Sequence, residues 1–241
     1  MSKNVTPYTK SSLSKKDQVT LMFDRIATKY DKLNRVLSLG LDKGWRKKLT
    51  QLVVDQKAKY ILDIATGTGD IAISLSNIPN VKVDAVDLST EMLAVHAKQL
   101  NKFNLNDKIK LHVADAEQLP FGQDFDAVTV AFGIRNFANL KKGLKEMYRV
   151  LRPGGGLYIL ETSRPKKFPM RQAHFIVSKI LIPAMGKIFA KDKDAYTYLG
   201  NSASVFPDGR EMCNKLHDIG FSKVKQKTLS GGVVTLYNAQ K

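Results

Sequence analysis

The stretch YILDIATGTGD, residues 60–70, decides the fold of this chain. It opens with a short apolar run containing β-branched residues, which is typical of a buried strand, and it closes with Thr-Gly-Thr-Gly. Gly67 and Gly69 let the backbone turn tightly and approach a ligand closely, and a helix is expected just beyond them. The stretch therefore predicts a strand, a glycine turn and a helix that together can hold a ligand.

The same alternation of strands and helices continues along the chain. Further strands are predicted at residues 81–88, 108–115, 125–132 and 156–162, and helices at residues 71–78, 89–100 and 140–151. Strands and helices at this spacing form βαβ units, which place a parallel sheet between two layers of helices. In such a sheet, ligands bind at the carboxyl ends of the strands, where the strand order reverses.

Helices and a closing hairpin are predicted on either side of this core. Residues 17–56 read as helices, and so do residues 168–218, with breaks near Pro183, Gly200 and Pro207. Residues 221–229 and 233–240, joined through Ser-Gly-Gly, predict an antiparallel hairpin. The expected fold is a Rossmann-like, doubly wound α/β domain with a mostly parallel, seven-stranded sheet.

We expect this single domain to have four parts. They are an N-terminal helical extension (1–56), a cofactor-binding core (57–163), a helical lid (164–218) and a C-terminal β-hairpin (219–241).

The cysteine and histidine content and the apolar segments of the chain argue against several classes of protein. The chain has one cysteine, Cys213, so it forms no intramolecular disulfide and no cysteine-based zinc site, and its four histidines show no ligand spacing. Residues 1–17 lack the apolar stretch of a secretory signal, and the most apolar segment, 175–189, is interrupted by lysines and a proline. We therefore expect a soluble cytoplasmic protein with no metal.

Charge is distributed unevenly along the chain. The chain holds 39 basic and 22 acidic residues, a net charge of +17, and the excess lies in residues 1–60 and 161–241 on either side of a neutral middle. Such flanks favour an anionic partner, for example nucleic acid, a phospholipid surface or an acidic ligand, although lysine-rich faces also simply keep proteins soluble. In residues 164–193, basic side chains alternate with an apolar stripe, which is typical of an interfacial helix or of a lid on the pocket.

Polar residues at the predicted strand ends indicate an adenosine-containing cofactor. Asp87 stands 20 residues after Gly67, where a carboxylate can accept both ribose hydroxyls. Gly67-x-Gly69-x-x-Ala72 also fits a dinucleotide fingerprint, so a nicotinamide dehydrogenase stays open on the glycines alone. Asp63 would repel a pyrophosphate but would hold the ammonium of a methionine moiety. Asp115 and Ala116 offer an acceptor and a backbone donor to an adenine edge.

The segments DIATGTGD, AVDLS, VADAEQLPF and RVLRPGG resemble the successive motifs of class I S-adenosylmethionine methyltransferases. A narrower resemblance covers nearly the whole chain. The chain is similar to the ubiquinone/menaquinone biosynthesis C-methyltransferase family in residues 22–46, 131–137, 196–209 and 229–237. The resemblance implies methyl transfer from S-adenosyl-L-methionine to a ring carbon of a polyprenylated quinol, either demethylmenaquinol, a 2-methoxy-6-polyprenyl-benzoquinol, or both.

The family resemblance also implies site residues. It assigns Thr68, Asp87, Asp115 and Ala116 to the cofactor, and the general methyltransferase pattern adds Asp63 and Gly67. The chain departs from the usual pattern at two positions, where alanines stand: Ala65, in place of a glycine, and Ala131, in place of a serine found in many relatives.

The chemistry of the acceptor points to further residues. A quinol carbon becomes nucleophilic when a neighbouring hydroxyl ionises, and at a phenol pKa near 10 this costs about 4 kcal/mol at neutral pH. Arg135, beside Asn136, is the candidate for stabilising the ring anion. Tyr30 and Asp31 are expected to close the pocket, with Asp31 as a proton acceptor, unless they serve only to end and pack a helix.

Several function classes remain as alternatives. An RNA methyltransferase would explain the net charge equally well, but the chain has no Asn/Asp-Pro-Pro-aromatic motif for flipped bases. Another small-molecule methyltransferase, a dehydrogenase and a binding module are further options. The expected partners are the quinol and the inner face of an anionic membrane, with no nucleic acid, and a homo-oligomer stays open.

Overall fold

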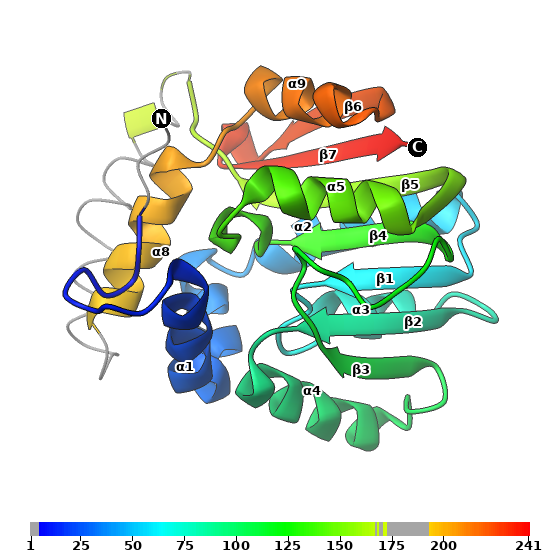
Figure 1. The fold of residues 1–241 in the computed structure, drawn as a ribbon, viewed down its shortest axis with the longest axis horizontal. Coiled ribbons are helices and arrows are strands. Elements are labelled where there is room, and N and C mark those ends of the chain that lie inside the picture. Colours follow the sequence, from blue (N-terminus) through cyan, green and yellow to red (C-terminus); the bar gives the residue numbers. More distant parts are fainter. Residues whose placement is uncertain (1–4, 167, 169–170, 173–192) are drawn as a thin grey trace.

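The computed structural model describes residues 5–166, 168, 171–172 and 193–241 (Figure 1). Its centre is one seven-stranded sheet in the order β3-β2-β1-β4-β5-β7-β6. The strands are β1 (Tyr60–Ile64), β2 (Lys82–Asp87), β3 (Ile109–Val113), β4 (Phe125–Ala131), β5 (Leu151–Thr162), β6 (Ser222–Leu229) and β7 (Val234–Gln240). The first five strands pair in parallel, and β7 runs antiparallel to both β5 and β6. The predicted Rossmann-like α/β fold is confirmed.

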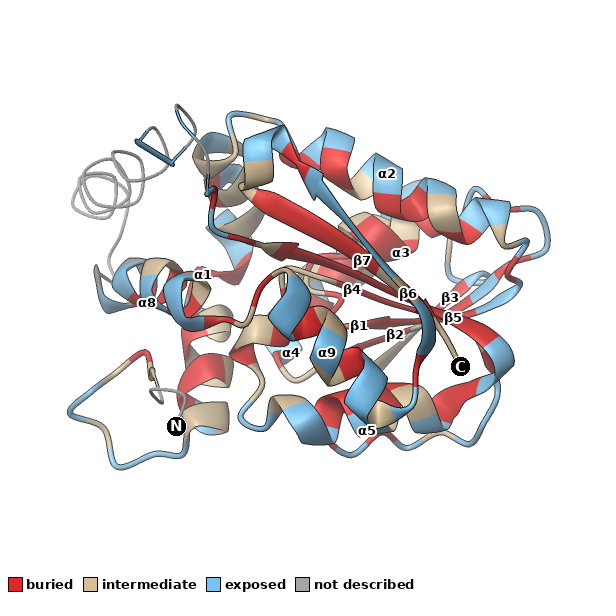
Figure 2. Cartoon of the chain, turned by 90° about the horizontal axis from the view of Figure 1, so that it is seen from above, coloured by how far each residue is buried: buried red, intermediate tan, exposed pale blue. Residues whose placement is uncertain are grey.

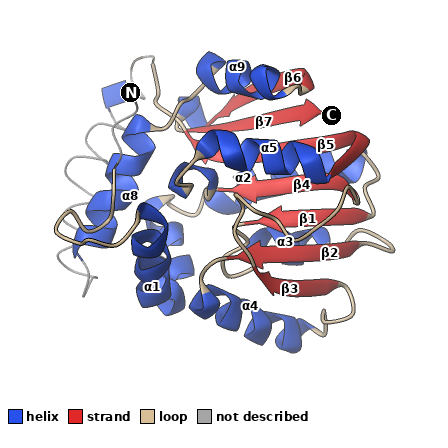
Figure 3. Ribbon diagram, viewed as in Figure 1, coloured by secondary structure: helices blue, strands red, loops and turns tan. Residues whose placement is uncertain are grey.

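Helices cover both faces of this sheet (Figure 3). The helices of the described part of the chain are α1 (Lys15–Leu37), α2 (Asp42–Asp55), α3 (Asp70–Leu75), α4 (Thr90–Phe103), α5 (Leu140–Val150), α8 (Lys193–Val205) and α9 (Arg210–Ile219), with short 3-10 turns η1 (Ile134–Asn136) and η3 (Ser230–Gly232). Two apolar clusters form the core, one beneath α5 and α9 and the other beneath α2 and α3. Figure 2 shows the sheet as the buried layer between these helix pairs.

Alternate side chains of strand β1 belong to the two apolar clusters. Leu62 and Ile64 of β1 join the cluster under α5 and α9, whereas Ile61 joins the cluster under α2 and α3. Side chains of a strand point to opposite faces in turn, so a strand covered on both faces must be apolar throughout. Asp63 is the polar exception within β1, and it lies at the carboxyl end.

Most boundaries of the predicted core elements lie within about three residues of the observed ones, and two places differ in another way. Strand β5 begins at Leu151, five residues before the predicted start, because Leu151 pairs with Phe125 before the register shifts and resumes at Gly156. Helix α8 continues through Gly200, where a break was predicted. A glycine in a helix costs only about 1 kcal/mol, and the buried Tyr198 and Leu199 next to it hold α8 in place. The predicted break at Pro183 lies outside the described residues.

Helices α1 and α8 lie beside the carboxyl ends of the central strands (Figure 1). They pack against each other and against α4 through a third apolar cluster that includes Met22, Ile26, Met92 and Tyr198. Among the described helices, none is long and apolar enough to cross a membrane. The carboxyl edge of the sheet is thus covered by helices that precede and follow the core in sequence.

Candidate active site

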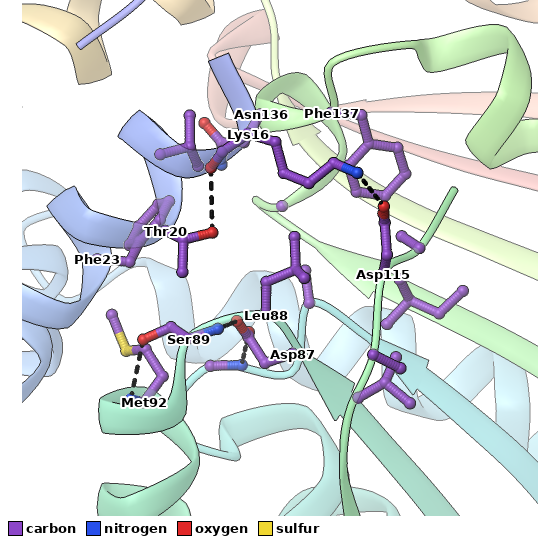
Figure 4. A pocket seen from close by; sticks show the side chains of 18 of the residues that line it. Lys16, Thr20, Phe23, Asp87, Leu88, Ser89, Met92, Asp115, Asn136 and Phe137 are labelled. Carbon is purple, nitrogen blue, oxygen red and sulfur yellow. Dashed lines mark hydrogen bonds and ion pairs between the residues drawn. The ribbon is translucent and has the colours of Figure 1, made fainter. Parts of the chain in front are cut away.

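A cavity opens at the carboxyl ends of the central strands, between them and α1 (Figure 4). Its wall includes six of the residues that the sequence predicts: Tyr30, Gly67, Asp87, Asp115, Ala116 and Asn136. They come from α1, from η1 after β4 and from the loops that follow β1, β2 and β3, which we call the three edge loops. Asp31, Asp63, Thr68 and Arg135 do not line this cavity and lie behind its wall.

The first edge loop is a left-handed turn. Ala65, Gly67 and Gly69 have φ values of 51°, 58° and 98°. Glycine adopts such values freely, whereas an alanine is strained there. Ala65 also explains the glycine at position 133, since a Cβ on Gly133 would lie 2.5 Å from the Cβ of Ala65.

Asp87 ties the first two edge loops together. Its Oδ2 accepts a hydrogen bond from the Gly67 amide at 2.8 Å, and its Oδ1 accepts one from the Ser89 amide at 2.9 Å. Burial raises the pKa of Asp87, and these amide donors act to lower it. Each carboxylate oxygen can accept a second bond, so Asp87 keeps acceptor capacity at the cavity wall.

Asp115 in the third edge loop is held from across the cavity. Lys16 on α1 reaches over and places its Nζ 2.6 Å from Asp115 Oδ2, as Figure 4 shows. Asp115 Oδ1 accepts from the Glu117 amide at 2.8 Å. The hydrogen bond to Asp115 raises the pKa of Lys16. Sequence reasoning missed Lys16 because 99 residues separate it from its partner.

Asp63 lies beneath the glycine turn and is 1% exposed. Its two oxygens accept hydrogen bonds from Thr66 Oγ1 and Thr129 Oγ1, both at 2.6 Å. Burial raises the pKa of Asp63 to about 6. The geometry gives Asp63 the role of supporting the turn from below.

Thr68 and Asp31 join α1 to the first edge loop. Thr68 Oγ1 donates to Asp31 Oδ1 at 2.5 Å. Burial, followed by the nearby charge of Asp70, raises the pKa of Asp31, while the Thr68 bond and two arginines, Arg46 and Arg35, oppose the rise. Asp31 is therefore a carboxylate of raised pKa that does not line the cavity and follows the lining residue Tyr30 on α1.

Arg135 forms a buried ion pair that the sequence did not reveal. Its Nη1 donates to Glu161 Oε1 and to the carbonyl of Phe132, both at 2.7 Å. The side chains of Arg135 and Glu161 are 8% and 0% exposed. Burial acts to lower the pKa of Arg135, but Glu161 and two tyrosines outweigh burial and raise it. Glu161 could have been suspected, because it is the one charged residue of the predicted strand 156–162.

Four buried polar atoms around this pair have no hydrogen-bond partner among the described residues. They are Arg135 Nε, Asn136 Oδ1, Glu161 Oε2 and Tyr198 Oη. We call these four residues the polar cluster. Burial raises the pKa of Tyr198 to about 12, so its hydroxyl stays protonated. A buried polar atom without a partner costs about 1–3 kcal/mol, so the polar cluster is suited to a polar ligand.

A model of the ubiE/COQ5 methyltransferase family matches residues 11–241. This chain belongs to that family. The match confirms the resemblance drawn from the sequence. It also makes the cavity and the polar cluster the candidate active site of a methyltransferase.

Individual relatives agree with the family match. A demethylmenaquinone methyltransferase of Bacteroides fragilis is 44% identical over 239 residues, covering 98% of this chain and 97% of the relative. A ubiquinone/menaquinone biosynthesis C-methyltransferase of Geotalea daltonii is 38% identical over 231 residues, covering 94% and 97%. A SAM-dependent methyltransferase structure from Thermotoga maritima shares the fold, with a TM-score of 0.65 at 17% identity, covering 92% of this chain and 98% of that one.

Proposed function

We propose that this enzyme transfers a methyl group from S-adenosyl-L-methionine to a ring carbon of a polyprenylated quinol. Demethylmenaquinol is the favoured acceptor, since the Bacteroides relative carries that name, and a 2-methoxy-6-polyprenyl-benzoquinol is the second candidate. The observation that carries the proposal is that Gly67 of the glycine turn, Asp87 and Asp115–Ala116 line one cavity. They lie at the carboxyl ends of three neighbouring strands, which is where a sheet of this kind binds its ligands.

We propose that the three edge loops hold the cofactor. Asp87 accepts the ribose hydroxyls, Asp115 and Ala116 contact the adenine edge, and the methionine moiety lies against Gly67. Thr68 and Asp63 then act from behind the turn, Thr68 through Asp31 and Asp63 by supporting the loop. The bound cofactor supplies an activated methyl group on its sulfonium.

We propose that the polar cluster receives the acceptor ring. Arg135, whose charge is fixed by its high pKa, stabilises the anion that forms when a ring hydroxyl ionises. Asn136 and Tyr30 line the cavity and orient the ring. Asp31 is the proposed proton acceptor, because its raised pKa moves it toward neutral pH.

We propose a cytoplasmic enzyme that associates peripherally with the inner face of the membrane. A polyprenyl tail is insoluble in water, so the acceptor must be collected at a lipid surface. The basic segment 164–193 lies largely outside the described residues, but Lys166 and Arg171 within it are exposed. Each basic side chain near an anionic leaflet contributes about 1 kcal/mol.

The test is methyl transfer by the purified chain to a short-tailed, water-soluble demethylmenaquinol. We expect Asp87→Ala to weaken S-adenosylmethionine binding about tenfold or more in calorimetry, because it removes charge-assisted hydrogen bonds. The control is Asp107→Ala, an exposed carboxylate outside the cavity, which leaves the affinity unchanged. Methylation of RNA with no methylation of the quinol, or binding of NAD in place of S-adenosylmethionine, would overturn the proposal.

A further inference from the structure

The turn between α1 and α2 presents apolar side chains to solvent. Three of the ten exposed large hydrophobic residues in the described part of the chain lie in residues 36–41. They are Val36, Leu39 and Leu41, which are 41%, 80% and 51% exposed. We call residues 36–41 the apical turn. Exposed apolar side chains that gather in one place mark an interaction site more often than scattered ones do.

Leu39 stands in a backbone conformation that disfavours leucine. Its φ is 52°, in the left-handed region, just after the helix cap Ser38, where glycine is the usual residue. The backbone of Leu39 is strained there, and its exposed side chain contributes nothing to the core. A residue that carries strain and exposure together points to a role outside the folded chain.

The apical turn is nevertheless firmly built. The Gly40 amide donates to the Arg35 carbonyl at 2.8 Å, and Ser38 Oγ donates to Asp42 Oδ1 at 2.8 Å. The Leu41 amide donates to the Ser38 carbonyl at 3.0 Å. These bonds fix the direction in which the leucines point.

The surroundings of the apical turn are positively charged. Exposed lysines flank it on both helices, at positions 32, 43, 47 and 48. The one acidic residue of this region, Asp42, is 3% exposed and faces Arg35 and Arg46. A second copy of this chain would bring like charges together, whereas an anionic lipid surface complements them.

The apical turn also lies near the candidate active site. Tyr30, six residues before Val36 on the same helix, lines the cavity, which corresponds to about 9 Å along α1. On the other side of the turn, Arg46 of α2 lies over the ring of the cavity residue Phe132. The apolar tip and the cavity therefore share the carboxyl edge of the sheet.

We propose that the apical turn inserts its three apolar side chains into the interfacial region of an anionic phospholipid bilayer while the flanking lysines bind the lipid headgroups. The purpose of this contact, delivery of a lipid-tailed acceptor, rests on the proposed function. The contact itself does not. It assigns the membrane surface to residues distinct from segment 164–193.

The first experiment measures sedimentation of the full chain with phosphatidylcholine vesicles, with and without phosphatidylglycerol. We expect Leu39→Asp combined with Leu41→Asp to weaken binding to anionic vesicles about tenfold or more, because two apolar contacts are lost and two negative charges are added. The matched control is Phe103→Asp, an exposed apolar residue beside Lys102 at the far end of α4, which should bind within about twofold of wild type. Equal binding by the two variants would overturn the inference.

A second measurement locates the turn. Leu39→Cys in a Cys213→Ala background carries an environment-sensitive dye, and Phe103→Cys provides the comparison. The dye at position 39 should shift to shorter wavelength on anionic vesicles, and the dye at position 103 should not. A concentration-dependent shift without vesicles would show that the turn binds a second copy, which contradicts the inference.

Activity separates this inference from the proposed function. The Leu39→Asp/Leu41→Asp variant should methylate a short-tailed, water-soluble quinol at the wild-type rate. If wild type methylates no quinol while the variant still loses vesicle binding, the proposed function fails and the membrane contact stands. If wild type methylates the quinol and the variant binds vesicles as wild type does, the proposed function stands and the membrane contact fails.

Discussion

At the carboxyl ends of β1, β2 and β3, each of the predicted carboxylates accepts a hydrogen bond on both of its oxygens, whereas four buried polar atoms of the polar cluster have no partner among the described residues. Asp63, Asp87 and Asp115 are bonded to threonine hydroxyls, backbone amides and Lys16. The polar cluster has one ion pair, and four of its buried polar atoms have no hydrogen-bond partner in the described part of the chain. From this difference we propose that the edge loops are organised before any ligand binds and that a ligand completes the polar cluster.

The largest expected effect comes from breaking the polar cluster. Glu161→Leu leaves the buried Arg135 charge without its carboxylate, with only the Phe132 carbonyl still bonded to it, so we expect a loss of about 3–5 kcal/mol in the free energy of unfolding. Urea titration measures it. Arg135→Met combined with Glu161→Leu removes both charges and should recover most of that loss. A double variant as unstable as the single one would show that the ion pair is not the cause.

The next effect concerns a histidine under the edge loops that breaks the pattern of satisfied groups. His96 is fully buried against Gly69, its two ring nitrogens have no partner among the described residues, and burial lowers its pKa to about 4. Between pH 6.5 and 4 the unfolded histidine binds a proton and the folded one does not, so wild-type stability falls as the pH drops. We expect His96→Leu to gain about 3 kcal/mol relative to wild type across this window.

Asp63 provides the matched control, because its pKa is shifted the other way. The folded carboxyl binds a proton near pH 6 and the unfolded one near pH 4, so this group adds stability as the pH falls between these values. Asp63→Asn lacks this contribution, so its stability relative to wild type should fall as the pH is lowered from about 6 to about 4. Urea titrations at several pH values measure both variants. Parallel pH curves for wild type and His96→Leu would contradict the account.

The smallest effect tests the contact between the first edge loop, which holds Ala65, and Gly133, which directly precedes η1 with Arg135 and Asn136. Gly133→Ala places a Cβ 2.5 Å from the Cβ of Ala65, and overpacking of this kind costs about 1–3 kcal/mol. Ala65→Gly removes the clash and relieves the left-handed strain at position 65. The double variant should therefore be more stable than Gly133→Ala alone. Additive effects in this double-mutant cycle would mean that the two positions do not interact.

The same contrast decides what the sequence could predict. The edge loops follow from local signals, since Gly67, Asp87 and Asp115 each lie at or just after the end of a strand that periodicity identifies, and parallel strands bring their ends together. The partners of these residues do not follow. Lys16 meets Asp115 across 99 positions and Glu161 meets Arg135 across 26. No spacing rule links such pairs, because their distance depends on how helices pack on the finished sheet.

The boundaries show the same limit. Gly200 reads as a helix break in the sequence, yet buried neighbours on α8 outweigh the weak preference of one glycine. The early start of β5 depends on the pairing of Leu151 with Phe125, a contact between two strands. In both places, packing between distant segments outweighs the secondary-structure preference of the local sequence.

The most direct test compares cofactor affinity and methyl transfer in one protein. The stability-restored variant Arg135→Met/Glu161→Leu changes the polar cluster and leaves the edge loops untouched. Calorimetry with S-adenosylmethionine should give an affinity within about twofold of wild type, while methyl transfer to a short-tailed quinol in a single turnover falls by roughly 100-fold or more. Methyl transfer at the wild-type rate, or a parallel loss of cofactor affinity and methyl transfer, would contradict the division of the site into a pre-organised cofactor region and a ligand-completed acceptor region.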